Sequence, residues 1–416
     1  LAERLPFEPR ILGYLRLDPP IPRMHRRTPE GVERDIRERI FPRDWFHPTY
    51  EGGADWQKAL DRVNTAAARI ARVVVHPDYR SEGFGALLVR VALEWAKERG
   101  APEARREKHL VYTIAQMARY HPFFEKVGFR YLFDTASGRP VLFYPLTEEA
   151  EAHLERFLRE DPYAKAHGGR LYKPRFGRVP GLPGPIRLAG VHKAYRSHLD
   201  LEGLSREVQE ALLAFGVKAR VVERAVLRGA SLEIPPGSLV VLAGASGAGK
   251  TTLLRLLLGE APDAGEVAVP PGRRVAYIPG EREVDLGEAP ILEAVYRRLK
   301  DVGAAIEVLN RVGLSDAVLY RARPHELSTG QRERFRLALL LAERPDLLLI
   351  DEVAAHLDVP TARRVALGLG KLCREAGVTL VAATHRPEVV AALDPDLLVY
   401  VGYGGLTTVP RRGPRT

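Results

Sequence analysis

Residues 240–259 read VVLAGASGAGKTTLLRLLLG, in which an apolar run leads into a glycine-rich turn and then into a helix-forming run. This order of strand, glycine-rich loop, Lys-Thr and helix is the one that a phosphate-binding P-loop requires. Glycines let consecutive backbone N–H groups turn towards phosphates, and the N-terminus of the following helix adds positive potential. Lys250 would reach the terminal phosphates, and the Thr251 hydroxyl would bind Mg²⁺. The residues expected around the nucleotide are Gly244, Ser246, Gly247, Gly249, Lys250, Thr251 and Thr252.

A second apolar run, Leu347–Ile350, ends in Asp351 and Glu352. Downstream of a P-loop, a strand that ends in two carboxylates predicts a metal-binding and catalytic pair. Asp351 would hold the water shell of Mg²⁺, and Glu352 would polarise the water that attacks the γ-phosphate. From Pro185 onward, strands and helices alternate as in a parallel α/β domain. These features predict binding of ATP or GTP by a P-loop NTPase fold.

Residues 327–331, between these two motifs, read LSTGQ. They resemble the LSGGQ signature of ABC ATPases, with Thr329 in place of the first glycine. In that family the signature caps the γ-phosphate held by the P-loop of a second subunit. The resemblance therefore implies an ATP-hydrolysing homodimer with composite sites that contain Mg²⁺. The signature residues implied in this role are Ser328, Gly330 and Gln331.

Three more motifs resemble the ABC family. Tyr195 in IRLAGVHKAYRS resembles the aromatic residue that stacks on adenine, residues 355–358 (AHLD) resemble the D-loop, and His385 resembles the switch histidine. The resemblance implies that Asp358 belongs to the ATP site and that Glu352 and His385 are catalytic. Two departures stand out. Gly280 occupies the position of the family's glutamine, for which Glu281 could substitute, and residues 198–224 form an insertion. The insertion could contact the other domain or a partner, or simply be a helix that packs on the sheet.

Residues 69–100 contain a β-branched strand, a glycine-containing turn and a helix. Turns of this kind bind pyrophosphate through backbone N–H groups. The stretch resembles motif A of GNAT acetyltransferases, and residues 109–132 resemble that family's next strand, helix and Gly-Phe pair. The resemblance implies a mixed-sheet domain that binds acetyl-CoA. The residues implied in the cofactor site are Val74, Val75, Arg80, Ser81, Gly83, Phe84, Gly85 and Ala86.

The acetyl-transfer residues are less defined. GNAT enzymes often protonate the departing thiolate with a tyrosine whose position here holds Phe124. Tyr120, expected one turn earlier on the same helix face, could serve as the catalytic acid or could simply pack. His76, His109 and His121 are candidate bases or structural residues. An acetyl-CoA sensor without turnover therefore remains an alternative.

The chain has 416 residues, which suggests two domains. We expect a GNAT-like domain over 1–146, a helix and basic linker over 147–183, and an ABC ATPase domain over 184–416. No apolar run is long enough to span a membrane, and the single Cys373 argues against disulfides; both favour a cytoplasmic protein.

The net charge of +10 favours polyanionic partners, with nucleic acid first and anionic membrane second, although an arginine-rich composition without such a partner is the alternative. Residues 164–183, a basic linker with Tyr172 and Phe176, could grip a nucleic-acid backbone and stack on bases, or could be plain solvated chain.

As a whole, the chain resembles prokaryotic fusions of an ABC-type ATPase to an acetyltransferase-like domain. We therefore expect an ABC ATPase coupled to an N-acetyltransferase that acts on RNA, including tRNA, or on DNA. One alternative is a nucleic-acid-binding ABC clamp whose GNAT-like module senses acetyl-CoA or recruits partners without acetyl transfer. A transporter ATPase subunit is a lesser alternative.

Overall fold

The computed structural model describes residues 2–4, 9–21, 23–47, 65–76, 83–98, 106–199, 201–217, 220–280, 285–402 and 405–411. The chain divides into two compact units, Leu1–Pro174 and Arg175–Thr416. Both are mixed α/β structures, so the predicted fold class is confirmed. Arg80, Ser81 and Glu281 lie outside the described residues.

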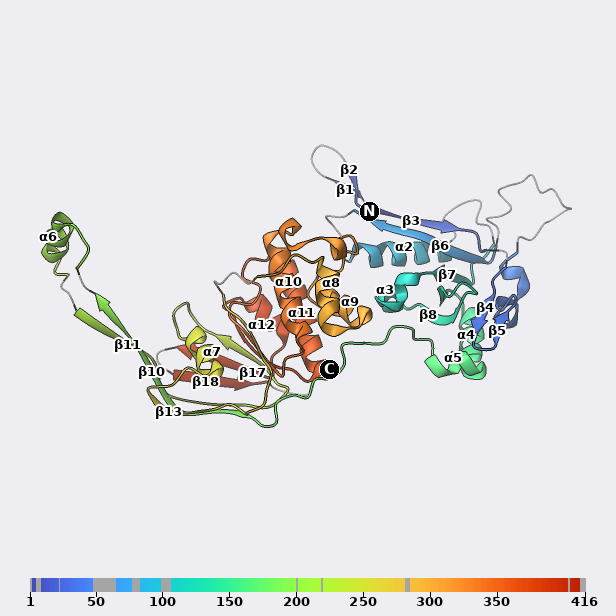
Figure 1. The fold of residues 1–416 in the computed structure, drawn as a ribbon. Helices are drawn as coiled ribbons and strands as arrows, with labels where there is room; N and C mark the ends of the chain where they lie inside the picture. The colour runs from blue at the N-terminus through green and yellow to red at the C-terminus, as the bar shows by residue number, and fades with distance from the viewer. Residues whose placement is uncertain are drawn as a thin grey trace. The chain divides into compact units, whose positions relative to one another are not determined.

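The first unit is built on a five-stranded mixed sheet with the order β3-β6-β7-β9-β8 (Figure 1). Its strands are β3 (Gly13–Asp18), β6 (Ala67–Val75), β7 (Leu110–Ile114), β8 (Arg130–Asp134) and β9 (Pro140–Pro145). Strands β6 and β7 are parallel, whereas the other pairs are antiparallel. Two short hairpins accompany it, formed by β1 (Ala2–Arg4) with β2 (Pro9–Ile11) and by β4 (Arg26–Thr28) with β5 (Gly31–Glu33).

Helices cover both faces of this sheet because alternate strand residues are apolar. Tyr112 and Phe143 lie in the core with α1 (Arg37–Ile40), the 3₁₀ turn η1 (Arg43–Trp45) and α4 (Glu148–Glu160). Val111 and Leu142 point to the other core, with α2 (Phe84–Glu98) and α3 (Phe123–Val127). The remaining elements are η4 (Gln116–Arg119) and α5 (Pro162–His167).

A buried ion pair ties the β4–β5 hairpin of the first unit to α5. The guanidinium of Arg26, only 3% exposed, donates two 2.9 Å hydrogen bonds to the Asp161 carboxylate and also pairs with Glu33. Burial by itself would raise the pKa of Asp161, but the hydrogen bonds from Arg26 and from backbone N–H groups lower it below its usual range. The charge of Asp161 is therefore stabilised in the folded state.

The second unit contains a six-stranded sheet with the order β14-β15-β16-β12-β17-β18, in which only the last pair is antiparallel. Its strands are β12 (Leu239–Ala243), β14 (Val275–Ile278), β15 (Leu347–Ile350), β16 (Thr379–Ala383), β17 (Leu397–Gly402) and β18 (Gly405–Pro410). β15 and β16 are buried along their whole length, as their continuous apolar sequences predict.

Alternate residues of these strands face two separate cores. The helices and 3₁₀ turns of the unit are α6 (Arg206–Ala214), α7 (Lys250–Leu258), α8 (Ile291–Leu299), α9 (Val302–Arg311), η5 (Leu319–Arg321), η6 (Pro324–Glu326), α10 (Thr329–Ala342), α11 (Val359–Ala376) and α12 (Pro387–Leu393). Helices α8 to α11 contribute to one core, and α7 packs in the other. All parallel strands therefore end at one edge of a sheet that is covered on both faces.

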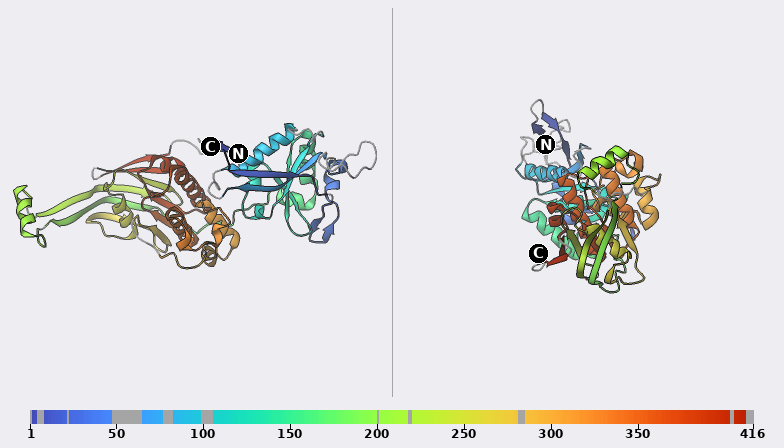
Figure 2. Two further views of the ribbon diagram at one scale, coloured as in Figure 1. Left: turned by 90° about the horizontal axis from the view of Figure 1, so that it is seen from above. Right: turned by 90° about the vertical axis from the view of Figure 1, so that its left-hand side faces the viewer.

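A second sheet, β11-β10-β13, forms an antiparallel layer in this unit. It consists of β10 (Ile186–Leu199), β11 (Arg220–Ile234) and β13 (Ala264–Ala268). β10 and β11 are long paired strands, and the 198–224 insertion places α6 at their far end (Figures 1 and 2). None of the α6 residues is buried, so in this unit α6 does not pack on the sheet.

The segment that we considered as a basic linker is partly embedded in the second unit. Phe176 (1% exposed), Val179 and Leu182 are buried among core residues, and Arg344 lies over the Phe176 ring at 5.0 Å. The idea that Phe176 stacks on bases is therefore wrong, because burial in the core leaves its ring inaccessible. Within the described residues, no helix is long and apolar enough to cross a membrane.

We predict that Arg26→Ala destabilises the first unit by about 3–5 kcal/mol, because it leaves the buried Asp161 carboxylate without its cation. Arg159→Ala, which removes an exposed ion pair with Glu160, should cost less than about 0.5 kcal/mol. All three tryptophans precede Pro174, so urea unfolding followed by tryptophan fluorescence reports on this unit. Equal midpoints for the two variants would contradict the prediction.

Candidate functional site

The predicted P-loop joins β12 to α7 through a turn that only glycine can form. Gly244, Gly247 and Gly249 have φ angles of 149°, 72° and 111°. A Cβ atom at Gly244 would lie 2.3 Å from the Val401 carbonyl oxygen, and one at Gly249 would lie 2.5 Å from Val226 Cγ1. Positive φ and close backbone approach therefore both demand glycine here. This cradle fits a phosphate chain at the N-terminus of α7.

The side chains that follow the loop are held by hydrogen bonds within the unit. Lys250 is 5% exposed, and its Nζ donates to the carbonyls of Gly244 (2.9 Å) and Ala245 (3.0 Å). The Thr251 hydroxyl donates to Asp351 Oδ2 at 2.7 Å. Burial raises the pKa of the Asp351 carboxyl, an effect that the hydrogen bond from Thr251 opposes. Mg²⁺ prefers oxygen ligands, so a hydroxyl and a carboxylate this close together suit a Mg²⁺ site.

The candidate catalytic pair lies at the ends of two neighbouring strands. Glu352 Oε2 is 2.9 Å from Nδ1 of His385, and the two residues follow β15 and β16. Glu352 has a φ angle of 56°, an unfavourable conformation for a residue with a side chain. Such conformations are enriched at functional sites. The structure therefore brings together the two residues that the sequence predicted as catalytic.

The LSTGQ residues form the N-terminus of α10. Ser328 is the N-cap: its hydroxyl accepts from the Gln331 N–H (3.3 Å), and the Gln331 side chain accepts from the Ser328 N–H (2.9 Å). A Cβ at Gly330 would be 2.8 Å from Leu357 Cδ2, so this glycine allows α10 to approach the predicted D-loop. Ser328 and Thr329 are exposed. Within the described chain, no hydrogen bond links LSTGQ to the P-loop.

Asp358 and Arg386 organise the segment around residues 355–358. The Asp358 carboxylate accepts the Thr361 N–H (2.9 Å) and caps α11, which lowers its pKa. Arg386 donates to the carbonyls of Ala354 (2.6 Å) and Leu357 (2.8 Å). Reasoning from the sequence missed Arg386, because nothing in its local pattern shows which carbonyls it reaches.

Tyr195 and Gly280 are two further positions that the sequence analysis linked to the ATP site. Tyr195, on β10, is half-buried, and its hydroxyl donates to Glu260 Oε1 at 3.3 Å. Gly280 follows β14, and an added Cβ would lie 3.9 Å from Glu352 Cβ and Cγ. Gly280 is thus directly beside the candidate catalytic glutamate, with room for a side chain.

In the first unit, strand β6 extends beyond its pairing with the parallel strand β7. Their pairing runs from Ala67–Leu110 to Ile70–Thr113, whereas β6 continues to Val75. Gly83 (φ 88°) directly precedes α2. A Cβ at Gly85 would be 3.0 Å from the Phe123 ring, so Gly85 lets α2 approach α3. The backbone N–H groups at the N-terminus of α2 suit a pyrophosphate such as that of acetyl-CoA.

The residues considered for acetyl transfer are placed differently from our expectation. The helix expected to carry both Tyr120 and Phe124 is broken: Tyr120 ends the 3₁₀ turn η4, and α3 starts at Phe123 after Pro122. Proline has no N–H to donate and disfavours helical conformation before it, so Tyr120 and Phe124 do not share one helix face. Phe124 is buried (4% exposed) against Phe123 and Phe129.

The candidate bases differ in their surroundings. His109 stacks on Trp45 (4.3 Å) and hydrogen-bonds the Thr147 hydroxyl. These contacts favour a structural role for His109 over that of a base. Burial lowers the pKa of His121 to about 4, so His121 is neutral at pH 7. Its Nδ1 is buried without a hydrogen-bond partner. His76 is exposed after β6.

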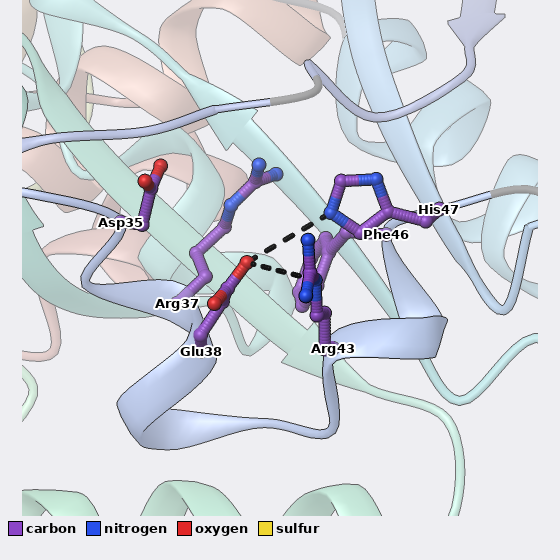
Figure 3. Close-up of a pocket in the computed structure, with 6 residues that line it drawn as sticks. All are labelled: Asp35, Arg37, Glu38, Arg43, Phe46 and His47. Carbon is purple, nitrogen blue, oxygen red and sulfur yellow. Dashed lines mark ion pairs between the residues drawn. The ribbon is translucent and has the colours of Figure 1, made fainter.

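A small pocket in the first unit is lined by none of the residues predicted for the two candidate sites (Figure 3). Glu38 lies there between Arg43 (3.5 Å) and His47 (3.9 Å). The remaining lining residues are Asp35, Arg37 and Phe46. The pocket has room for about one water molecule, so it is too small for a substrate.

Comparison with known families gives two matches in the chain. Residues 227–355 match the model described as ABC transporter, and residues 51–131 match the model described as acetyltransferase (GNAT) domain. The chain is 34% identical over 198 residues to a zinc import ATP-binding protein of Ruegeria pomeroyi, covering 46% of this chain and 75% of that protein. It is 35% identical over 193 residues to a lipoprotein-releasing system ATP-binding protein of Rhodospirillum rubrum, covering 41% and 84%. The chain belongs to the ABC family of ATP-binding proteins. It is a fusion, because it also carries a GNAT acetyltransferase domain.

For some other relatives, the match covers little more than half of their length. The chain spans 56% of the methionine import ATP-binding protein of Mesorhizobium japonicum, with 34% identity over 209 residues and 44% of this chain covered. Among solved structures, a dimeric bacterial ABC transporter cassette matches with 22% identity and a TM-score of 0.40, covering 55% of this chain and all of that one.

We predict that Glu352→Gln lowers ATP turnover by about 10²–10⁴-fold, the usual contribution of a general base, with little change in ATP affinity. Glutamine keeps the size of the side chain and can still hydrogen-bond His385, so the site should stay folded. Phosphate release and nucleotide affinity measure the two effects. Glu343→Gln, at the exposed end of α10, is the control. Turnover above a tenth of the parent value would exclude Glu352 as the base.

We predict that Gly280→Gln raises ATP turnover several-fold, because the new amide would lie beside Glu352 and could orient the attacking water. Gly280→Ala adds only the Cβ, for which there is room, and should leave turnover unchanged. Steady-state phosphate release compares the three proteins. No gain of the glutamine variant over the alanine variant would show that the missing glutamine does not limit hydrolysis.

Proposed function

We propose that this protein hydrolyses ATP as a homodimer and couples that cycle to acetyl-CoA-dependent N-acetylation. The observation that supports it best is the assembly of Lys250, Thr251, Asp351, Glu352 and His385 at one sheet edge. The P-loop would hold the phosphates of ATP. Thr251 and Asp351 would hold Mg²⁺, which would neutralise negative charge on those phosphates. Glu352 would take a proton from the attacking water, and His385 would orient Glu352.

The exposed N-terminus of α10 supports the proposed dimer. Ser328, Gly330 and Gln331 share no hydrogen bond with the P-loop within the described chain, yet the family resemblance assigns both to one ATP site. A second copy would bring its α10 N-terminus and Asp358 to the γ-phosphate side, while Tyr195 would stack on the adenine. ATP would then join two identical subunits.

The first unit would supply the acetyl donor site. Backbone groups of Val74 and Val75 would pair with the pantetheine arm. Arg80, Ser81 and Gly83, with Phe84, Gly85 and Ala86 in the first turn of α2, would hold the pyrophosphate. Positioning would contribute most of the rate. The net charge of +10 supports RNA or DNA as the acceptor.

One observation favours acetyl-CoA sensing without transfer. Phe124, at the position where many GNAT enzymes have a tyrosine, is buried in the core and has no proton to give. Tyr120 is then the remaining candidate acid. A further alternative is an ATPase subunit of an importer, since several relatives are import ATP-binding proteins.

We predict that labelled acetyl-CoA transfers label to cellular RNA or DNA in the presence of ATP. Tyr120→Phe should lower this transfer by about 10²-fold if its hydroxyl is the acid. Tyr163→Phe, a half-buried control whose hydroxyl donates to Glu30, should not. Scintillation counting of purified nucleic acid is the measurement. Absence of transfer to either nucleic acid at every ATP concentration would refute acetylation of nucleic acid and leave the sensor alternative.

A further inference from the structure

Arg224 on β11 lies beside the P-loop. Its guanidinium donates to the Gly247 carbonyl at 2.8 Å, and a Cβ on Gly247 would lie 3.1 Å from the same nitrogen. Two residues further along β11, the Val226 side chain occupies the space that a Cβ on Gly249 would need. This part of β11 thus rests directly against the turn that would hold phosphates.

Arg224 is also next to the candidate adenine site. In the antiparallel register of β10 and β11, Arg224 is the direct partner of Tyr195. Directly paired residues project from the same face of a sheet, with Cβ atoms about 5 Å apart. Arg224 therefore lies between the residue expected to stack on the base and the loop expected to bind the phosphates.

Among the described residues, no carboxylate compensates the charge of Arg224. The adjacent Glu223 pairs instead with Arg196 (3.0 Å). Arg224 is exposed. A guanidinium has more N–H donors than the single contact to Gly247 uses, and its planar fork suits phosphate oxygens.

We propose that Arg224 is a nucleotide-binding residue whose guanidinium, held by the Gly247 carbonyl, contacts the α-phosphate of the bound nucleotide. This inference rests on the proposed ATP site and adds a contact from β11, the strand that follows α6 in the chain. The contact is charge-assisted and exposed, so its loss should weaken binding by about tenfold.

Binding of ATP, ADP, AMP and adenosine to Glu352→Gln protein, alone and combined with Arg224→Ala or Arg224→Lys, tests the assignment by calorimetry. We expect the alanine variant to weaken ATP, ADP and AMP about tenfold and to leave adenosine unchanged. The lysine variant should recover part of the loss, because it keeps a positive charge. Arg228→Ala, an exposed arginine on the same strand, should bind all four ligands like the Glu352→Gln protein.

Equal ATP affinity with and without Arg224 would overturn the inference while leaving the ATP site intact. An equal loss for adenosine would also overturn it, because the effect would then be a distortion of the base site. A loss for ATP and ADP without one for AMP would refute the α-phosphate assignment. Failure of the Glu352→Gln protein itself to bind ATP would overturn the proposed ATP site, and this inference with it.

Discussion

The hydrogen bond between Thr251 and Asp351 depends on the parallel order of β14, β15, β16 and β12. Parallel strands end at the same edge of a sheet, so the P-loop, the acidic pair and His385 meet although more than a hundred residues separate the first from the last. The two cores on either face hold the strands in register. A slip of one residue would turn every buried side chain of β15 to the opposite core.

In the first unit, one strand is longer than its parallel neighbour. Strand β6 pairs with β7 only over Ala67–Ile70, while its pairing with β3 continues to Val75. The buried Arg26–Asp161 pair ties the β4–β5 hairpin to α5, and the aromatic core around Tyr112 packs α1 and α4 on the sheet.

The β10–β11 hairpin connects features that are far apart in the second unit. Tyr195 and Arg224 pair directly in this hairpin, and Arg224 hydrogen-bonds the glycine-rich loop. Beyond the far end of the hairpin, Phe215, which directly follows α6, is 86% exposed. The proposed nucleotide contacts of Tyr195 and Arg224 would therefore lie on the same two strands that carry the insertion.

By itself, the sequence determined the fold class, the glycine-rich loop before α7 and the acidic strand end, because glycine, lysine and carboxylate at fixed spacing have few other uses. It could not show that Pro122 separates Tyr120 from Phe124, or that Phe176 belongs to a core, since helix continuity and burial depend on neighbours distant in the chain. The hydrogen-bond partners of Arg386 and Arg224 could not be predicted from the sequence either. An arginine side chain is long enough to reach several carbonyls. Which carbonyl it contacts depends on the tertiary structure and cannot be predicted from the local sequence.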